Sequence, residues 1–354
     1  MPKLDFSKLT PSAKEVESLK DLIQFTAFED ENLEKFMTFI GTAQHGKKVG
    51  FIGEMEDVGV KGTGCNPTYK PATIASSEKT WDIGEWQIPL SLCYKELEGT
   101  IAEYCLKSGT EIGDLTSTEY MQYVARPALE KAMMKMMWRF AWFGDKDAQS
   151  VSSGGVIKDG VNVELFKTCD GLFKRLFAIT TEHENQKTTI AANEQTTYAL
   201  QKSRLLEAGV ATGIFDDMLL NADSRITSNG GAFIVTDSLA KALAYDMKKT
   251  YKEIMPWTVL SDGLEVSTYG GVPVLKVALW DRFINAYQNN GTKLNIPHRA
   301  VLSSVGNLLI GAPQNDLISD LDIWFDRKDR QNYFYSAGKL GSMVLEDGLI
   351  HMAY

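Results

Sequence analysis

The sequence is poor in the two residue types that most often build disulfides and metal sites. Four cysteines and four histidines are present among 354 residues. The cysteines are Cys65, Cys93, Cys105 and Cys169, and they form no CxxC pair and show no spacing typical of metal ligands. Cys93 and Cys105 lie in apolar runs, where buried free thiols are common. We therefore expect reduced thiols in a cytosolic product, without a disulfide framework.

Long hydrophobic runs and basic clusters are also missing. No stretch approaches the roughly 20 apolar residues that a membrane helix needs. Met1–Phe6 lacks the apolar core of a signal peptide. The formal net charge is −9, and the lysines and arginines are scattered among acidic residues. Because a dedicated nucleic-acid-binding protein usually carries a basic stripe or domain, the sequence predicts neither a membrane partner nor sequence-specific binding of nucleic acid.

The chain lacks the local patterns that mark common active sites. Gly59, Gly62 and Gly64 are followed by no GK[ST], so they indicate a loop tip rather than a phosphate-binding loop. Ser303 and Ser304 have no nearby general base, and no GxSxG is present. We predict no catalytic, cofactor-binding or metal-ligating residue. The histidines are widely separated and are expected at surface or turn positions: His45, His183, His298 and His351.

What the sequence does contain is enough apolar material for a buried core. Apolar residues make up 44% and charged residues 23% of the chain, as in an ordinary soluble protein. The length of 354 residues predicts about two domains. Along the chain, a long hairpin precedes a long helix, then a block of mixed helices and strands, then an antiparallel end. That order indicates an α+β fold rather than a regular alternation of strands and helices.

Residues 46–92 are predicted to form a long hairpin around a loop rich in glycine. On its return strand the apolar positions are odd before Gly84 and even after it, which predicts a β-bulge at this glycine. A two-stranded ribbon is barely stable alone in water. We therefore expect the ribbon to lean on something outside its own domain, with Trp81 and Trp86 in contacts at or near its base. The apolar residues of the two strands are Val49, Phe51 and Ile52, then Trp81, Ile83, Trp86, Ile88 and Leu90.

The strongest helix pattern runs from Thr116 to Phe143. Thr116–Glu119 is a capping box, and apolar residues at helical spacing follow it. Pro127 lies inside this span, where proline bends or splits a helix. We predict one helix bent near Pro127. The alternative is a helix that begins at Pro127, because proline is well tolerated at the first helical position.

Shorter elements fill the rest of the chain. Asp237 is expected to cap a helix that follows a buried strand, and Tyr269-Gly270-Gly271 to turn a hairpin. The expected helices are Tyr94–Lys107, Leu165–Ile179, Tyr198–Ala208 and a short one near Met218 and Leu219. The expected strands are Ala232–Thr236, Leu264–Ser267, Val272–Leu275, Asn307–Gly311, Leu321–Phe325 and Arg330–Ala337, with a closing hairpin through Glu346-Asp347-Gly348.

This ordered set of parts resembles the tailed-phage major capsid proteins with the fold first seen in Hong Kong phage ninety-seven. Trp81–Leu90 leading into Tyr94–Glu98 is similar to that family's exit from its extended loop. Tyr269–Val274 is similar to its Y-x-G-x-P-hydrophobic turn, and Leu321–Asp326 to one of its terminal strands. The resemblance covers the whole chain and rests on the order of the parts, since no single motif is highly specific.

The resemblance implies a capsid fold with an N-terminal arm, an extended β-hairpin loop, a long spine helix, a peripheral domain and an axial domain. It implies a structural subunit that self-assembles through hexamers and pentamers into an icosahedral or prolate head enclosing double-stranded DNA. Portal and scaffolding or decoration proteins would be partners, with assembly in the host cytoplasm. The implied boundaries are 1–45 for the arm, 46–92 for the extended loop, 93–190 for the peripheral domain with the spine helix, 191–315 for the axial domain and 316–354 for the return to the peripheral domain.

The predicted assembly contacts lie in and around the extended loop: Trp81, Trp86, Gly84, Lys61 and Lys70. Some members of the family form a Lys–Asn isopeptide bond between subunits. No matching Asn and Glu can be named here, so cross-linking is not carried over. Two other readings stay open. One is the shell protein of an encapsulin-type nanocompartment, which would need a pocket for cargo, and the other is a soluble enzyme of an unrecognised class.

Overall fold

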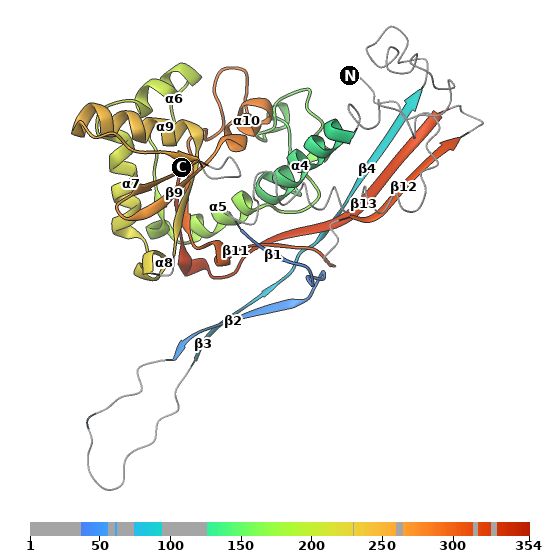
Figure 1. Cartoon of the computed structure of the whole chain (residues 1–354), viewed down its shortest axis with the longest axis horizontal. Coiled ribbons are helices and arrows are strands. Elements are labelled where there is room, and N and C mark those ends of the chain that lie inside the picture. Colours follow the sequence, from blue (N-terminus) through green and yellow to red (C-terminus); the bar gives the residue numbers. More distant parts are fainter. Residues whose placement is uncertain are drawn as a thin grey trace.

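The computed structural model describes residues 37–55, 61, 74–93, 126–228, 230–259, 265–313, 318–326 and 331–354. The described part forms an elongated molecule in which a thick body of helices and strands continues into a long, narrow sheet (Figure 1). A two-stranded ribbon projects from the region where the body and the narrow sheet meet. Residues 1–36 of the predicted arm, the helix Tyr94–Lys107 and the capping box Thr116–Glu119 lie outside the described residues.

The body is built on a seven-stranded mixed sheet. Its strand β6 (Ala232–Thr236) is buried at every position, as expected for a strand covered on both faces. β6 pairs with β9 in parallel and with β10 in antiparallel orientation. The strand order is β5 (Lys187–Thr188), β14 (Ile350–Ala353), β10 (Ala300–Ser303), β6, β9 (Val272–Val277), β8 (Glu265–Tyr269) and β7 (Thr258–Val259).

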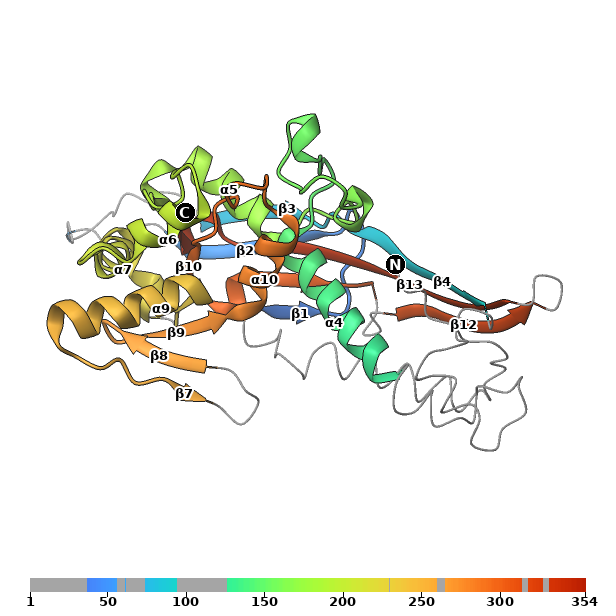
Figure 2. The same cartoon turned by 90° about the horizontal axis from the view of Figure 1, so that it is seen from above.

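Helices surround this sheet (Figure 2). A π-helical turn, η6 (Met247–Tyr251), continues the helix that follows β6. The α-helices of the described part are α4 (Arg126–Phe143), α5 (Leu172–Glu182), α6 (Tyr198–Leu205), α7 (Val210–Asn221), α8 (Ser224–Ser228), α9 (Asp237–Asp246) and α10 (Ala278–Tyr287).

The alternation of β6 divides these helices into two groups. Phe233 and Val235 share a core with α7 and α9, whereas Ile234 shares a core with α4, α5 and α10. Because successive side chains of a strand point to opposite faces, the two groups lie on opposite faces of the sheet. Three rings mark the meeting point of the second group. The Trp142 and Trp280 ring centroids are 4.5 Å apart, and Phe173 lies 5.1 Å from the first and 4.8 Å from the second.

The narrow sheet is organised around the 14-residue strand β13 (Gln331–Val344). β13 runs antiparallel between β4 (Gly84–Cys93) and β12 (Ile318–Asp326), and its last residues pair with β11 (Leu308–Gly311). β11 in turn pairs in parallel with β1 (Thr38–Ile40). Leu340 and Val344 of β13 belong to the same core as α4 and α5, so these helices join the two sheets.

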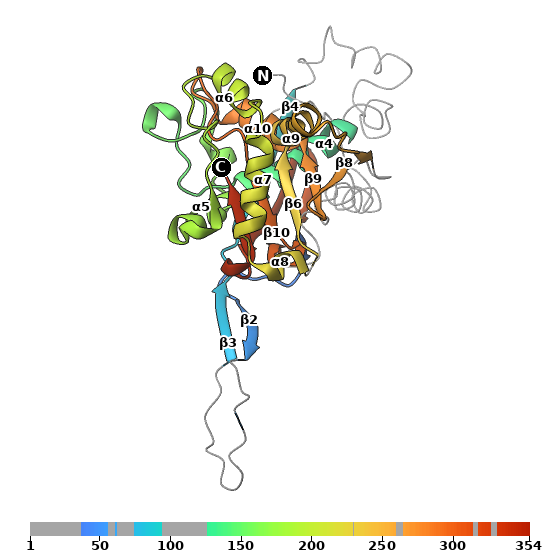
Figure 3. The ribbon, with the colours of Figure 1, turned by 90° about the vertical axis from the view of Figure 1, so that its left-hand side faces the viewer.

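The ribbon consists of β2 (Lys48–Met55) and β3 (Ile74–Thr80), with one irregularity in register between Ile52 and Met55. Within the described residues, these two strands pair only with each other. Figure 3 shows the ribbon as a narrow extension that leaves the body at one end. The predicted return strand is therefore divided in two: β3 belongs to the ribbon, and β4 belongs to the narrow sheet.

Several predicted elements are confirmed, including the buried strand β6 and the hairpin of β8 and β9. At the hairpin turn, Gly270 and Gly271 have φ angles of 56° and 83°. Both lie in the left-handed region that favours glycine, as a two-residue hairpin turn requires. The helix expected near Met218 is also present, although it extends over twelve residues, from Val210 to Asn221. The helix expected from Leu165 begins instead at Leu172, after a 3-10 turn at Val163–Leu165.

The predicted closing hairpin is wrong. β13 ends in the narrow sheet, and after the 3-10 turn Asp347–Leu349 the chain enters the other sheet as β14. There β14 lies between β10 and β5 and is buried at all four positions, which hides more apolar surface than an exposed hairpin would. The side chain of Asn307 holds the turn, since its Nδ2 donates to the carbonyls of Glu346 (3.0 Å) and Leu349 (3.1 Å).

The expected capping role of Asp237 is also wrong. Thr236 is the N-cap residue of α9 and makes no side-chain cap bond. The backbone N–H groups of Asp237 and Ser238 donate instead to the carboxylate of Asp281 at 2.6 and 3.1 Å. Asp281 belongs to α10, so one helix supplies the cap of another. The Asp237 carboxylate accepts a hydrogen bond from Lys241 at 2.6 Å.

Two of the four histidines are buried, which corrects the expectation that all lie at the surface or in turns. His298 is 2% exposed and His351 is 1% exposed. The Nδ1 atom of His298 is 2.9 Å from the hydroxyl of Ser238. The side-chain amide of Asn193 donates to the His298 carbonyl at 2.8 Å and accepts from the His298 N–H at 3.0 Å. Burial lowers the pKa of His298 to about 4 and also lowers the pKa of His351.

We expect the burial of His298 to make the subunit less stable in mild acid. The folded protein holds this imidazole neutral, whereas the unfolded chain protonates it below a pKa of about 6.5. The resulting loss of stability begins as pH falls through about 6.5 and grows until pH 4, and reaches about 2 kcal/mol at pH 5. Urea unfolding at pH 7 and pH 5, compared between the parent and His298→Asn, measures this contribution. An equal pH dependence in both proteins would contradict it.

Candidate assembly site at the base of the ribbon

The ribbon joins the body through three residues, Trp81, Asp82 and Ile83, that separate β3 from β4. The backbone N–H of Trp81 donates to the carbonyl of Lys47, and the N–H of Gly46 donates to the carbonyl of Trp81, both at 2.9 Å. These bonds continue the pairing of β2 and β3 to Trp81, the first residue of this three-residue linker. The chain therefore enters the linker in a fixed direction.

Trp81 fixes the linker by burying its whole side chain. It is 1% exposed and forms a small core with Ala43, Ile83, Leu309 and Met343. The indole lies directly on the backbone of Gly311, where an added Cβ would come within 2.7 Å of the ring atom Cη2. A bulky side chain and a glycine in a neighbouring strand thus form a matched pair, and the linker is held against β11.

The backbone before and after Ile83 is also tightly enclosed, and a glycine permits the close approach on each side. A Cβ on Gly341 of β13 would come within 2.7 Å of the Asp82 carbonyl oxygen. A Cβ on Gly84 would overlap the carbonyl oxygen of Thr168 and lie 2.6 Å from its carbonyl carbon. The β-bulge predicted at Gly84 is wrong, because the register from Gly84 to Cys93 is unbroken. The change of face at this position comes from the passage between two sheets, and glycine is required by the neighbouring backbone.

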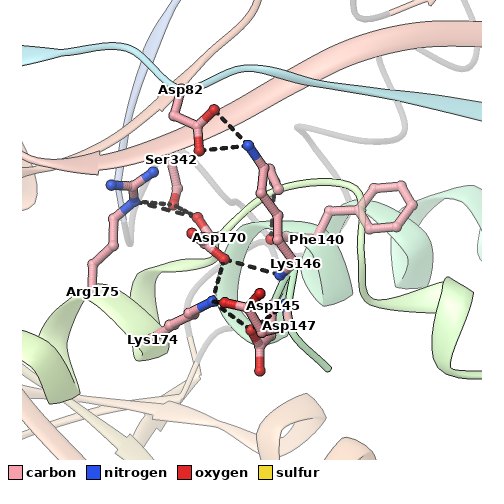
Figure 4. A network of polar contacts seen from close by, with 10 residues as sticks. Asp82, Phe140, Asp145, Lys146, Asp147, Asp170, Lys174, Arg175 and Ser342 are labelled. Atoms are coloured by element: carbon pink, nitrogen blue, oxygen red, sulfur yellow. Dashed lines mark hydrogen bonds and ion pairs between the residues drawn. The ribbon is translucent and has the colours of Figure 1, made fainter. Parts of the chain in front are cut away.

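A network of charged side chains clamps the linker from the other side (Figure 4). Both carboxylate oxygens of Asp82 accept hydrogen bonds from Lys146 Nζ, at 2.6 and 2.7 Å. The backbone N–H of Lys146 donates to Asp170, whose carboxylate also pairs with Lys174 at 2.8 Å. Ser342 of β13 donates to the Asp170 carbonyl at 2.6 Å. The network thus joins the linker to the loop after α4, to the start of α5 and to β13.

Lys174 is the centre of positive charge in this network. It pairs with Asp145, Asp147 and Asp170 at 2.6 to 2.8 Å. Burial alone would lower the pKa of Lys174, but the hydrogen bonds to three carboxylates outweigh it and raise the pKa above its usual range. Burial likewise opposes the ionisation of Asp170, yet its bonds from Lys174 and Lys146 hold its pKa below the usual value. Both shifts favour the charged forms, so the Lys174–Asp170 pair is an ion pair at neutral pH.

A second contact holds the ribbon slightly further out. Lys79 Nζ donates to the carbonyl of Val344 at 2.8 Å and pairs with the carboxylate of Asp347. Val344 is the last residue of β13, and Asp347 begins the 3-10 turn that follows it. By contrast, the Lys48–Glu78 pair joins β2 and β3 to each other, and its side chains are 63% and 57% exposed. Contacts to the body thus gather at the base of the ribbon.

We expect Asp82→Asn to loosen this base with a small cost in stability. The Asp82 and Lys146 side chains are 32% and 38% exposed, so the lost ion pair is screened and should cost at most about 1 kcal/mol. Glu78→Gln, which removes a more exposed pair in the ribbon, is the matched control and should be neutral. Urea unfolding of the subunit measures both. A Glu78→Gln effect as large as that of Asp82→Asn would contradict a special role for the base.

The predicted contact residues have different outcomes. Trp86 is 4% exposed and shares a core with Met133, Met136 and Phe140 of α4. Because Trp81 and Trp86 are buried within their own subunit, we expect their replacement to harm folding as well as assembly. Their contact with a neighbouring subunit stays a prediction. Lys61 is exposed, and Lys70 lies outside the described residues.

The sequence did not reveal the charged partners of the linker. Lys146 is 64 residues from Asp82 in the chain, and Lys174 lies further along. The only signal was the run Asp145-Lys146-Asp147, which is also typical of an exposed loop. Gly311 and Gly341 stand in strands where glycine usually indicates a bulge or a close approach of another backbone. Only the fold shows that both face the linker.

The chemistry of this site is mechanical and electrostatic. Among the described residues, no group of three or more His, Cys, Asp or Glu side chains is placed to hold a metal ion. Cys169 is buried next to Thr168, the residue that contacts Gly84. Burial raises the pKa of its thiol to about 12. No helix in the described part of the chain is long and apolar enough to cross a bilayer. The arrangement is suited to hold a projecting ribbon at a fixed angle.

Comparison with known proteins places this arrangement in a known fold. No protein-family model and no curated protein matches the sequence. A chain of the satellite phage P4 procapsid, in a structure including the size determination (Sid) protein, matches with a TM-score of 0.51 at 12% identity over 95% of this chain and 98% of its own. This chain has a phage capsid fold. A chain of Mycobacterium phage Ogopogo agrees, with a TM-score of 0.52 at 8% identity over 100% and 96% of the two chains.

The phage capsid fold confirms the predicted fold class, with its mixture of helices and sheets. The finer divisions into arm, extended loop, peripheral domain and axial domain stay predictions. The described helix α4 begins at Arg126, directly before Pro127. A helix extending back to Thr116 with a bend at Pro127 involves residues outside the described part, so it also stays a prediction.

Proposed function

We propose that this chain is a major capsid subunit, which self-assembles into an icosahedral or prolate head that encloses a phage genome. The observation that carries the proposal is the ribbon of β2 and β3. Its base is fixed by Trp81, by the Asp82–Lys146 pair and by Lys79, while its described strands pair with nothing but each other. A structure that fixes the angle of a projecting ribbon so firmly is useful when a neighbour receives that ribbon.

Assembly would supply the stability that the ribbon lacks. A two-stranded ribbon is marginal alone in water, so covering one face with a neighbouring subunit favours the assembled state. In hexamers and pentamers, each copy would both give a ribbon and receive one. Many modest contacts per copy then add up to a stable shell without any covalent step.

The remaining partners follow from the same proposal. The genome would be enclosed without sequence-specific contacts, because a net charge of −9 does not favour tight binding of phosphates. Portal and scaffolding or decoration proteins would share the virion, after assembly in the host cytoplasm. The encapsulin-type shell and the unrecognised enzyme remain the two alternatives.

Expression of the full chain, followed by sedimentation velocity and negative-stain microscopy, tests the proposal. We expect closed particles or hexameric and pentameric intermediates rather than a compact monomer. A globular monomer at every concentration, also in the presence of a scaffolding protein, would argue against a shell function. The content of purified particles separates the shell alternatives, since nucleic acid indicates a virus head and packaged protein indicates a nanocompartment.

A further inference from the structure

Two side chains stand out by their exposure on the body. Leu220 is 83% exposed and Ile254 is 82% exposed, more than any other large hydrophobic side chain of the described residues. Leu220 lies on α7, and Ile254 follows the π-helical turn that continues α9. Both elements lie at the end of the molecule opposite to the outer end of the narrow sheet (Figure 1). The surroundings of the two side chains carry opposite charge.

Ile254 lies in a basic patch, which we define as Lys248, Lys249, Tyr251, Lys252 and Ile254. All five are exposed, and none of the three lysines pairs with a described carboxylate. Lys252 has a φ angle of 60°, a left-handed conformation that a residue with a side chain adopts only when its surroundings impose it.

The segment before the basic patch is firmly held. The Asp246 carboxylate accepts bonds from the N–H groups of Gly209 (2.8 Å) and Thr212 (3.1 Å) and from the hydroxyl of Thr250 (2.7 Å). α7 and the π-helical turn are thereby joined. The start of the basic patch is thus held against α7.

Leu220 lies in an acidic patch, which we define as Gly213, Asp216, Asp217 and Leu220. These residues recur at helical spacing, so they share the exposed face of α7. Asp216 accepts a bond from the hydroxyl of Tyr269 at 2.7 Å, and Asp217 accepts one from the hydroxyl of Thr188 at 2.7 Å. Both donors are neutral, and no described cation forms an ion pair with either carboxylate.

We propose that the acidic patch of one copy of this chain docks on the basic patch of another copy. Each patch places one exposed aliphatic side chain among charges that are mainly of one sign: three lysines and the single carboxylate of Glu253 around Ile254, and two carboxylates around Leu220. Leu220 of one copy would pack against Tyr251 and Ile254 of the next, while Asp216 and Asp217 would face Lys248 and Lys249. An apolar centre with a charged rim is the usual anatomy of a protein interface, and opposite charges favour the correct register over others.

A second copy of this chain would cover both the acidic and the basic patch, whereas nucleic acid would cover only the basic patch. Nucleic acid would account for the lysines but leave Leu220 and the two carboxylates uncovered. The inference rests on the proposed function, because it assumes a subunit that meets copies of itself. It adds a contact that does not involve the ribbon.

Charge reversal tests the inference. The basic-patch variant is Lys248→Glu with Lys249→Glu, and the acidic-patch variant is Asp216→Lys with Gly213→Lys. Gly213 is chosen because a Cβ there would meet nothing within 4 Å and its φ is not in the left-handed region. Circular dichroism melting of each variant first establishes that the subunit is folded. Assembly is then measured as the protein concentration at which particles appear in sedimentation at low salt.

Each variant alone should need a concentration at least roughly tenfold higher than the parent, because like charges would face each other. An equimolar mixture of the two variants should assemble close to the parental concentration, because each reversed patch then meets its reversed counterpart. The mixture is its own control, since its components carry the substitutions that fail separately.

The outcomes separate this inference from the proposed function. A parent chain that stays a globular monomer at every concentration, also in the presence of a scaffolding protein, would contradict the proposed function. Parental particles, together with folded variants that assemble like the parent or with a mixture that stays unassembled, would overturn the docking of the two patches alone. An effect confined to the lysine variant, with less nucleic acid in its particles, would assign the basic patch to nucleic acid and also overturn the inference.

Discussion

Replacing Gly84 with alanine is expected to destabilise the subunit by more than about 3 kcal/mol, beyond the usual range for overpacking. The added Cβ would overlap the carbonyl oxygen of Thr168, which is backbone and cannot rotate away as a side chain would. Either β4 or the segment before α5 must move. Because β4 pairs with β13 over ten residues, the displacement would extend along the narrow sheet. Urea unfolding of the subunit measures the loss.

Gly50→Ala is the matched control for this substitution. Gly50 lies in β2, and an added Cβ would meet no atom within 4 Å. The change in unfolding free energy should stay within about 0.5 kcal/mol, as for other surface substitutions. If Gly84→Ala were as mild as Gly50→Ala, the close contact between Gly84 and Thr168 would be ruled out.

Trp81→Ala is expected to cost about 4 kcal/mol of subunit stability, within the range for aromatic residues removed from a core. The indole fills the space between Ala43, Leu309 and Met343 and lies on Gly311. The strands around it cannot close the gap, because β11 is held by pairing on both sides. Assembly should fail as a consequence, since the ribbon would lose its fixed direction.

Two measurements separate folding from assembly for this residue. Thermal unfolding of the isolated subunit reports stability, and sedimentation reports particles. Tyr198→Ala, at a side chain that is 48% exposed, is the control for removal of a ring at the surface. A Trp81→Ala subunit that melts like the parent but forms no particles would show that the indole serves mainly a neighbouring copy, contrary to its burial.

The elements of the fold could be predicted where one pattern decided them. The apolar run Ala232–Thr236 is a buried strand, and the paired glycines at 270 and 271 turn a hairpin as expected. The apolar positions do change from odd to even at Gly84, but the β-bulge predicted from this change is wrong. A bulge and a passage between two sheets both shift the apolar pattern by one residue, so the pattern does not distinguish them. The closing hairpin failed for a similar reason, since short strands give no sign of which sheet they enter.

The site could be predicted in position but not in composition. The tryptophans of the return strand indicated its base, yet their partners come from strands and helices far along the chain. The capping of α9 by Asp281 and the contact of the Trp81 indole with Gly311 depend on packing between distant segments. Local propensity contains no information on such pairs, so only the assembled tertiary structure reveals them.

The continuity between β3 and β4 has a mechanical consequence. β4 continues the line of the ribbon on the other side of the linker (Figure 1). A pull on the ribbon would therefore act along the axis of β4. The hydrogen bonds of an antiparallel pair lie perpendicular to the strands, so this load is shared in shear by all ten residue pairs between β4 and β13 instead of opening them one after another. A subunit held by its ribbon would therefore resist tension through all of these hydrogen bonds at once, rather than lose them one by one from the end.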